Sequence, residues 1–181
     1  MNTMCVTELF SQTEFKPLVR YGLEVPGYQV SKCGQIYSTK TGTILKPYYY
    51  NEKNVSGDRE EPRLRELIYT LAIPYGFFPE HTHKKRKGRN NSKLPLSAHR
   101  AVAETWMPID EFPPESIAPY WDILPEAVKQ WVRDTAIIDH IDDNPANNHV
   151  SNLRWVTPKQ NNARRKAVEM LSVKDELICI D

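Results

Sequence analysis

A stretch near the C-terminal end of the chain, residues 136–166, constrains the fold more than any other part of the sequence. It reads AIIDHIDDNPANNHVSNLRWVTPKQNNARRK. An apolar run that ends on Asp139 and His140 predicts a short strand, and the alternating residues 153–157 predict a second strand returning beside it. The loop between them is crowded with Asp and Asn, whose side chains bond nearby backbone and hold loops compact. Loop structure is our interpretation of Asn144, Asn147 and Asn148.

The second strand leads directly into a helix start. Thr157 is placed to cap the helix, Pro158 takes the first helical position, and Gln160 completes a capping box. Asn161 then falls in the first helical turn, at a fixed place facing the strand pair. The stretch therefore predicts strand, loop, strand and helix. The side chains expected to converge on one point are Asp139, His140, Asn152 and Asn161.

The N-terminal part of the chain has β-rich chemistry. Residues 25–50 alternate apolar and polar side chains and carry turns at Gly34 and Gly42, which predicts hairpins. Lysines and tyrosines are interleaved here. They fit either an exposed sheet with solvated lysines or a surface that lies along a phosphate backbone, and the spacing favours the first. Residues 66–78 predict a further strand bent near Pro74, and residues 1–20 predict only an irregular lead-in or a short helix.

A basic loop follows this strand. Residues 84–93 hold six Lys and Arg side chains and no acid. Such a run is usually a solvated loop, but six cations would also bind nucleic acid strongly, because each neutralised phosphate releases counterions. The pair His81 and His83 is more typical of an unliganded loop than of a metal site.

Two helices are predicted between this loop and residue 136. In the first, 96–107, Ser97 is a candidate cap, and His99 shares a face with Val102 and Trp106, so we interpret it as a packed core histidine rather than a catalytic one. A proline-rich insertion, 107–125, separates it from the second helix, 125–133. That helix carries an apolar stripe of Ala127, Val128, Trp131 and Val132.

The bulk properties of the chain exclude several classes. Its 181 residues suit one domain, or one small domain with an extension. The cysteines at 5, 33 and 179 form no CxxC pair, so a cysteine-based zinc site is not expected, and scattered thiols fit a reducing setting. We expect no signal peptide and no membrane span, and a cytoplasmic location.

The quoted motifs carry a family resemblance. The pattern of Asp139-His140, then NLRWVT, then Asn161 resembles the HNH nuclease family in its His-Asn-Asn form, found in phage and intron-encoded homing endonucleases. VPGYQVSKCGQIYSTKTGTILKP resembles the small module that often precedes this nuclease, and LSAHRAVAETWMP resembles the helix that joins the two. The implied fold is α+β: a ββα-metal (His-Me finger) nuclease core after a small β-rich module.

The resemblance also implies roles. Asp139 and Asn161 would bind one divalent metal, His140 would be the general base, and Asn152 would orient His140. The chemistry agrees, because histidine accepts protons near neutral pH and a sparse hard-oxygen ligand pair suits Mg²⁺ or Mn²⁺ better than zinc. Double-stranded DNA is the expected partner. The candidate DNA-binding residues are Lys84, Lys85, Arg86, Lys87, Arg89, Arg100, Arg154, Lys159, Arg164, Arg165 and Lys166.

The expected organisation has four parts: a lead-in (1–24), a β-rich DNA-contacting module with the basic loop (25–93), the nuclease domain with its insertion (94–166) and an acidic tail (167–181). Two features depart from the family pattern. Asp143 stands where the family often has glycine, and the tail, a candidate protein-docking segment, replaces the DNA reader of many homing relatives. The predicted function is a phage or mobile-element DNA endonuclease, nicking or double-strand cutting. The alternatives are a non-catalytic DNA-binding or packaging-accessory protein and a protein-interaction or inhibitory module.

Overall fold

A computed structural model describes residues 13–49, 66–78 and 90–164. The first sheet is antiparallel with strand order β1-β2-β3-β4, and the second has order β5-β6-β7. The first consists of β1 (Phe15–Arg20), β2 (Leu23–Ser31), β3 (Ile36–Ser38) and β4 (Thr43–Ile44), and the second of β5 (Tyr48–Tyr49), β6 (Leu67–Pro74) and β7 (Asn91–Ser97). The hairpins predicted over 25–50 and the strand predicted over 66–78 are confirmed.

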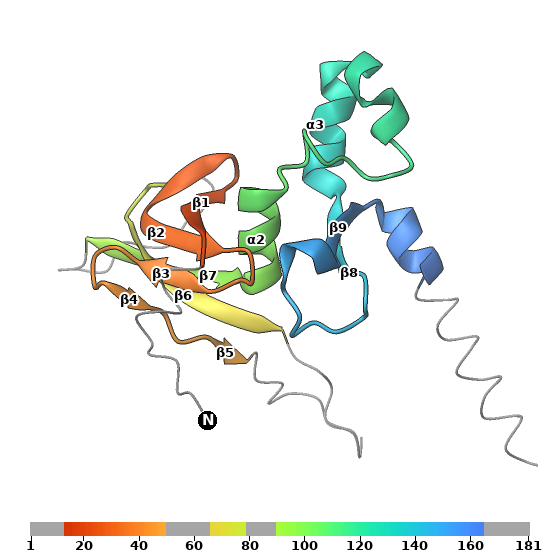
Figure 1. Ribbon diagram of the computed structural model, residues 1–181. Coiled ribbons are helices and arrows are strands. Elements are labelled where there is room, and N and C mark those ends of the chain that lie inside the picture. The colour runs from red at the N-terminus through yellow and green to blue at the C-terminus, as the bar shows by residue number, and fades with distance from the viewer. Residues whose placement is uncertain (1–12, 50–65, 79–89, 165–181) are drawn as a thin grey trace, which may run out of the picture.

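Helical and mixed structure follows the sheets. Helix α2 (Ala98–Trp106) leads to the 3-10 helix η1 (Ala118–Ile123) and to α3 (Glu126–Thr135). The strand β8 (Ile137–His140), the short η2 (Val150–Asn152) and the strand β9 (Leu153–Val156) complete the labelled elements, and residues 158–164 are helical. Figure 1 shows α2 between the two sheets on one side and the β8–β9 hairpin on the other. The fold is α+β, as predicted.

Three expectations about the elements are wrong. The lead-in contains β1, which pairs with β2 and buries Leu18 completely. The helix expected from residue 96 begins at Ala98, because Leu96 and Ser97 still belong to β7 and pair with β6. Ser97 makes no side-chain cap hydrogen bond. The second predicted helix is confirmed as α3, and of its apolar stripe Val132 is buried whereas Trp131 is 59% exposed.

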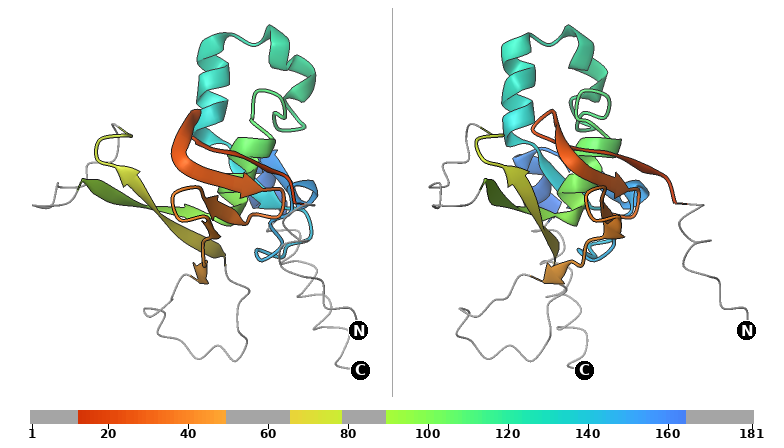
Figure 2. Two further views of the ribbon diagram at one scale, coloured as in Figure 1. Left: turned by 60° about the vertical axis from the view of Figure 1, so that its left-hand side comes forward. Right: turned by 90° about the vertical axis from the view of Figure 1, so that its left-hand side faces the viewer.

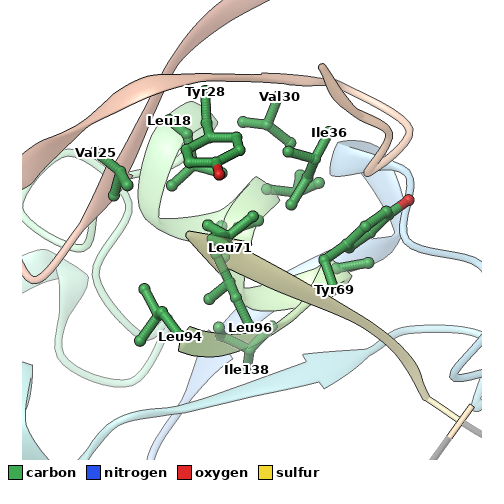
Figure 3. Close-up of a cluster of buried hydrophobic side chains, with 14 of the residues drawn as sticks. Leu18, Val25, Tyr28, Val30, Ile36, Tyr69, Leu71, Leu94, Leu96 and Ile138 are labelled. Carbon is green, nitrogen blue, oxygen red and sulfur yellow. The ribbon is translucent and has the colours of Figure 1, made fainter. Parts of the chain in front are cut away.

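One hydrophobic core joins the two sheets, α2 and the β8–β9 hairpin (Figure 3). It combines residues of both sheets, such as Val30 and Leu71, with Val102 of α2 and with Leu153 and Trp155 of β9. The β8–β9 hairpin is therefore packed on α2 rather than attached by a linker alone. Within the described ranges no helix is long and apolar enough to cross a membrane.

Candidate active site

The β8–β9 hairpin fixes the positions of the first two site residues. Its antiparallel register pairs Asp139 with Arg154 and His140 with Leu153. Successive residues of a strand point to opposite faces, so the side chains of Asp139 and His140 point in different directions at the end of β8. Both predicted strands of the stretch are confirmed within one or two residues of their expected ends.

Side-chain hydrogen bonds hold the loop between β8 and β9 in a closed conformation. The Asn152 amide nitrogen donates to Asp142 Oδ1 and to the Asn147 carbonyl, both at 2.8 Å, and its Oδ1 accepts from the Asp142 amide at 3.1 Å. Hydrogen bonds from Asn147, from the Asn144 amide and from Asn152 lower the pKa of Asp142. Asp143 takes φ 59°, so an aspartate occupies the left-handed position where glycine was expected to be common. The Asn152 side chain therefore holds the loop closed through its hydrogen bonds to Asp142 and Asn147.

A different asparagine contacts His140. His140 Nε2 lies 3.2 Å from Asn148 Oδ1, and Asn148 is only 3% exposed. The Asn148 amide nitrogen donates to the Ala146 carbonyl, which turns Oδ1 toward the imidazole. An amide oxygen only accepts, so Nε2 must carry the proton, and in a neutral ring Nδ1 then keeps the free lone pair. The side chain that contacts the His140 ring is thus Asn148, for which only loop structure was predicted, while the orienting role of Asn152 stays a prediction.

The helix after β9 starts as predicted. The Thr157 amide donates to Gln160 Oε1 at 2.8 Å, and the Gln160 amide donates to Thr157 Oγ1 at 3.2 Å, which is the reciprocal pattern of a capping box. The Asn161 amide bonds the Thr157 carbonyl, so Asn161 sits in a rigid first turn. Its side chain is half-buried.

Two arginines hold the carboxylate of Asp139. Arg154 donates to Asp139 Oδ2 through Nε and NH2 at 3.0 and 2.8 Å, and Arg164 NH1 does so at 2.5 Å. Arg164 also donates to the carbonyls of His140 and Ile141, which ties the helix to the end of β8. Burial lowers the pKa of Arg164, but its pairing with Asp139 outweighs this and raises it. Oδ1 of Asp139 takes no hydrogen bond from any described residue.

The sequence of this region matches a known family. Residues 132–163 match the family model described as HNH endonuclease. This segment of the chain, which contains Asp139, His140 and Asn161, is therefore similar to HNH endonucleases. A solved structure describing DNA binding and cleavage by the HNH homing endonuclease I-HmuI is also similar. It is 24% identical, with a TM-score of 0.48, and the match covers 92% of this chain and 67% of that one. No curated protein sequence matches the chain.

The candidate site has one further close neighbour. The His99 ring of α2 packs edge to face against His140, with ring centroids 5.3 Å apart and an interplanar angle of 74°. His99 is 9% exposed, as its interpretation as a core residue required. Burial, and then the charges of His140 and Arg100, lower its pKa to about 3. No local sequence pattern predicts this contact, because 41 positions separate the two histidines.

The predicted DNA-binding residues fall into three groups. Arg154 and Arg164 are engaged with Asp139, and Arg100 pairs with Glu104 at 3.3 Å. Lys159 is exposed on the helix. The remaining candidates lie outside the described residues: Lys84, Lys85, Arg86, Lys87, Arg89, Arg165 and Lys166.

A pocket of about 350 Å³ opens beside the candidate site. The insertion forms one wall through Met107, Phe112 and Glu115, and β9 forms the other. Asp139 and Arg154 also line it. The insertion and α3 project beyond this wall, away from the two sheets (Figure 2).

Proposed function

We propose that the chain is a metal-dependent endonuclease that hydrolyses phosphodiester bonds in double-stranded DNA. The observation that carries the proposal is the pairing of His140 with Asn148 at the end of β8, inside the segment that matches the HNH family. This pairing leaves Nδ1 as the ring's proton acceptor. A nucleophilic water needs such a base near neutral pH.

The donor set fits a hard divalent cation. Mg²⁺ is commonly held by one or two protein oxygens, with water and substrate phosphate completing its shell. Asp139 offers the unpaired Oδ1, because all three guanidinium contacts go to Oδ2. Asn161, fixed by the capping box, would offer the second oxygen. The described residues hold no cluster of three or more His, Cys, Asp or Glu, which favours this sparse shell over a zinc site.

The chain's own residues would divide the work as follows. His140 Nδ1 takes a proton from water as the water oxygen bonds to phosphorus and the bond to the leaving oxygen breaks. Asn148 keeps the ring in the reactive tautomer, and Asn152 keeps the loop closed. A bound cation would neutralise charge on the phosphate and assist the leaving oxygen. Lys159, with the predicted basic residues beyond the helix and in the 84–93 loop, would hold flanking phosphates.

Supercoiled plasmid gives the direct test. Wild type, His140→Ala and Asn161→Ala are incubated with Mg²⁺, with Mn²⁺ or with chelator, and DNA binding is measured in parallel. We expect wild type to nick or linearise plasmid only with metal, and both variants to bind DNA without cutting it. Binding without cleavage under either metal, on plasmids carrying varied inserts, would instead favour the non-catalytic DNA-binding alternative. Neither binding nor cleavage would favour an interaction module.

A further inference from the structure

His99 is buried in the first turn of α2, and its only ring neighbour among the described aromatic contacts is His140. Its Nε2 lies 3.4 Å from Ser97 Oγ, while Nδ1 has no hydrogen-bond partner among the described residues. A buried polar atom without a partner destabilises a fold. A leucine would fill the same space without that cost, so packing alone does not account for an imidazole here.

The turn between β2 and β3 lies against both α2 and the loop that carries Asn148. Gly34, at φ +84°, lies in the turn between β2 and β3. A Cβ added there would stand 3.1 Å from Asn148 Cβ and 3.3 Å from Ala98 Cβ. The Val150 amide also donates to the Lys32 carbonyl of the same turn at 2.8 Å. The turn, α2 and the loop therefore form one packed unit.

His140 is constrained from two directions by this unit. The hydrogen bond to Asn148 fixes one edge of the ring, but a single bond at Nε2 still permits the plane to rock about its χ2 torsion, which is soft for histidine. The edge-to-face contact with His99 opposes that rocking, because aromatic pairs at this separation favour a T-shaped arrangement. The neutral state of His99 avoids placing a second positive charge beside a base that must accept a proton.

We propose that His99 is a positioning residue for His140: its ring, packed across the imidazole, fixes the plane in which Nδ1 faces the attacking water. The inference rests on the proposed nuclease function. Because His99 lies far from the His140 motif in the sequence, local sequence patterns do not predict this role. His99 acts through His140 and has no contact of its own with substrate in this proposal.

The test compares three substitutions in the full chain. His99→Leu keeps the volume and removes the ring, and His99→Phe keeps a ring without nitrogens. The matched control Thr105→Val removes the hydrogen bond that Val19 donates to Thr105 at the other end of α2. We measure kcat, KM and Tm for each on the DNA that wild type cuts.

We expect His99→Leu to lower kcat about 10- to 100-fold with KM unchanged, as misplaced catalytic groups do. His99→Phe should restore kcat to within about threefold of wild type, because the T-shaped contact survives. Thr105→Val should lower Tm without lowering kcat. The positioning role would be overturned if His99→Leu kept the wild-type kcat. It would also be overturned if the Leu and Phe variants lost kcat equally at similar Tm.

A second readout separates this inference from the nuclease proposal. The ring C–H signals of His140 are followed by NMR in metal-free protein. We expect a nuclear Overhauser contact to His99 and one sharp ring environment in wild type and in His99→Phe, with shifted and exchange-broadened signals in His99→Leu. These spectra decide the matter even if wild type cuts no DNA. Identical His140 signals in all three proteins would refute the inference.

Discussion

At the scale of single residues, one buried amide decides how His140 can act. Asn148 is held by the Ala146 carbonyl on one side and meets His140 Nε2 on the other. We predict that Asn148→Ala lowers kcat about 100-fold with little change in KM, because the ring loses the bond that selects its tautomer. Steady-state cleavage kinetics and DNA affinity check this.

Asn144→Ala is the matched control for that prediction. Asn144 accepts a bond from the Ala146 amide in the same loop but contacts no proposed catalytic group. It should stay within about threefold of wild-type kcat, because Asn144 is only partly buried and loop substitutions away from the site have small effects. Equal loss of kcat in the two variants would mean that general loop order, rather than the tautomer of His140, controls the rate.

His99 makes stability depend on pH. Burial, and then the neighbouring His140 and Arg100, lower its pKa to about 3 in the fold, whereas a free histidine titrates near 6.5. The unfolded chain therefore binds the extra proton first, so the stabilisation is complete above about pH 6.5 and is lost as pH falls below it. We expect unfolding free energy to fall by about 1.4 kcal/mol per pH unit from this group between pH 6 and 4.

Urea unfolding of wild type and His99→Leu at several pH values isolates this contribution. Other groups, including Asp142 with its lowered pKa, titrate in both proteins and cancel in the comparison. The difference in unfolding free energy between wild type and His99→Leu should therefore change by about 1.4 kcal/mol per pH unit between pH 6 and 4, which corresponds to the uptake of about one proton on unfolding. Parallel curves would show that His99 titrates normally in the fold.

The sequence was informative about some residues and silent about others for a physical reason. Asp139 and His140 end an apolar run, and Thr157 with Gln160 obeys a local capping rule, so short-range chemistry predicts them. Asn148 and Asn152 lie in one Asx-rich loop, and their roles depend on which side chain faces inward after the loop closes. No local pattern separates them.

At the scale of elements, the β2–β3 turn supports the active-site loop from outside it. We predict that Gly34→Ala lowers both stability and cleavage. A side chain at φ +84° is strained, and its Cβ would press on Asn148 and Ala98. The expected destabilisation is about 1–3 kcal/mol from the strain alone. Thermal unfolding and cleavage rate are the measurements.

Gly76→Ala provides the matched control for the turn. Gly76 has a similar φ of +77°, but nothing lies within 4 Å of an added Cβ. It should carry the backbone strain without disturbing Asn148, so stability falls while the cleavage rate per folded molecule is retained. If Gly34→Ala also keeps that rate, the turn does not transmit strain to His140.

Element boundaries were harder to predict than element types. Leu94 and Leu96 alternate inward on β7, but the helical period of α2 begins two residues later, and the sequence alone merged them. On α3 the apolar stripe is real as a pattern, yet the helix projects from the body, and Arg133 is anchored instead by Asp110 and Glu126 at 2.6 Å. The periodicity of a sequence indicates which face of a helix is apolar, but it does not indicate how much of that face is buried against a core.

At the scale of the whole molecule, the β8–β9 hairpin and the two sheets share one core. Leu153 and Trp155 of β9 belong to the same buried cluster as Leu18 and Leu71, and the Trp155 indole donates to the Met107 carbonyl at 2.7 Å. We therefore predict a single cooperative unfolding transition. Tryptophan fluorescence and far-ultraviolet circular dichroism should give the same midpoint.

Calorimetry completes that measurement, since a calorimetric enthalpy equal to the van't Hoff value is the two-state test. Two separated transitions would mean that α2 links the sheets and the hairpin only loosely. The sequence predicted both parts and the helix between them. Their joint core could not be foreseen, because it depends on long-range packing of side chains from every layer.

The shared core has a consequence for genetics. A library of random variants screened for lost DNA cutting would recover substitutions at Val30 and Leu71, in the sheets, beside those at His140. The two groups would separate only when soluble yield was scored together with cutting. In a population under selection, substitutions in the sheets and in the β8–β9 hairpin would then be selected against together. Recombination between β7 and β8 would be selected against because it would separate parts that share one core.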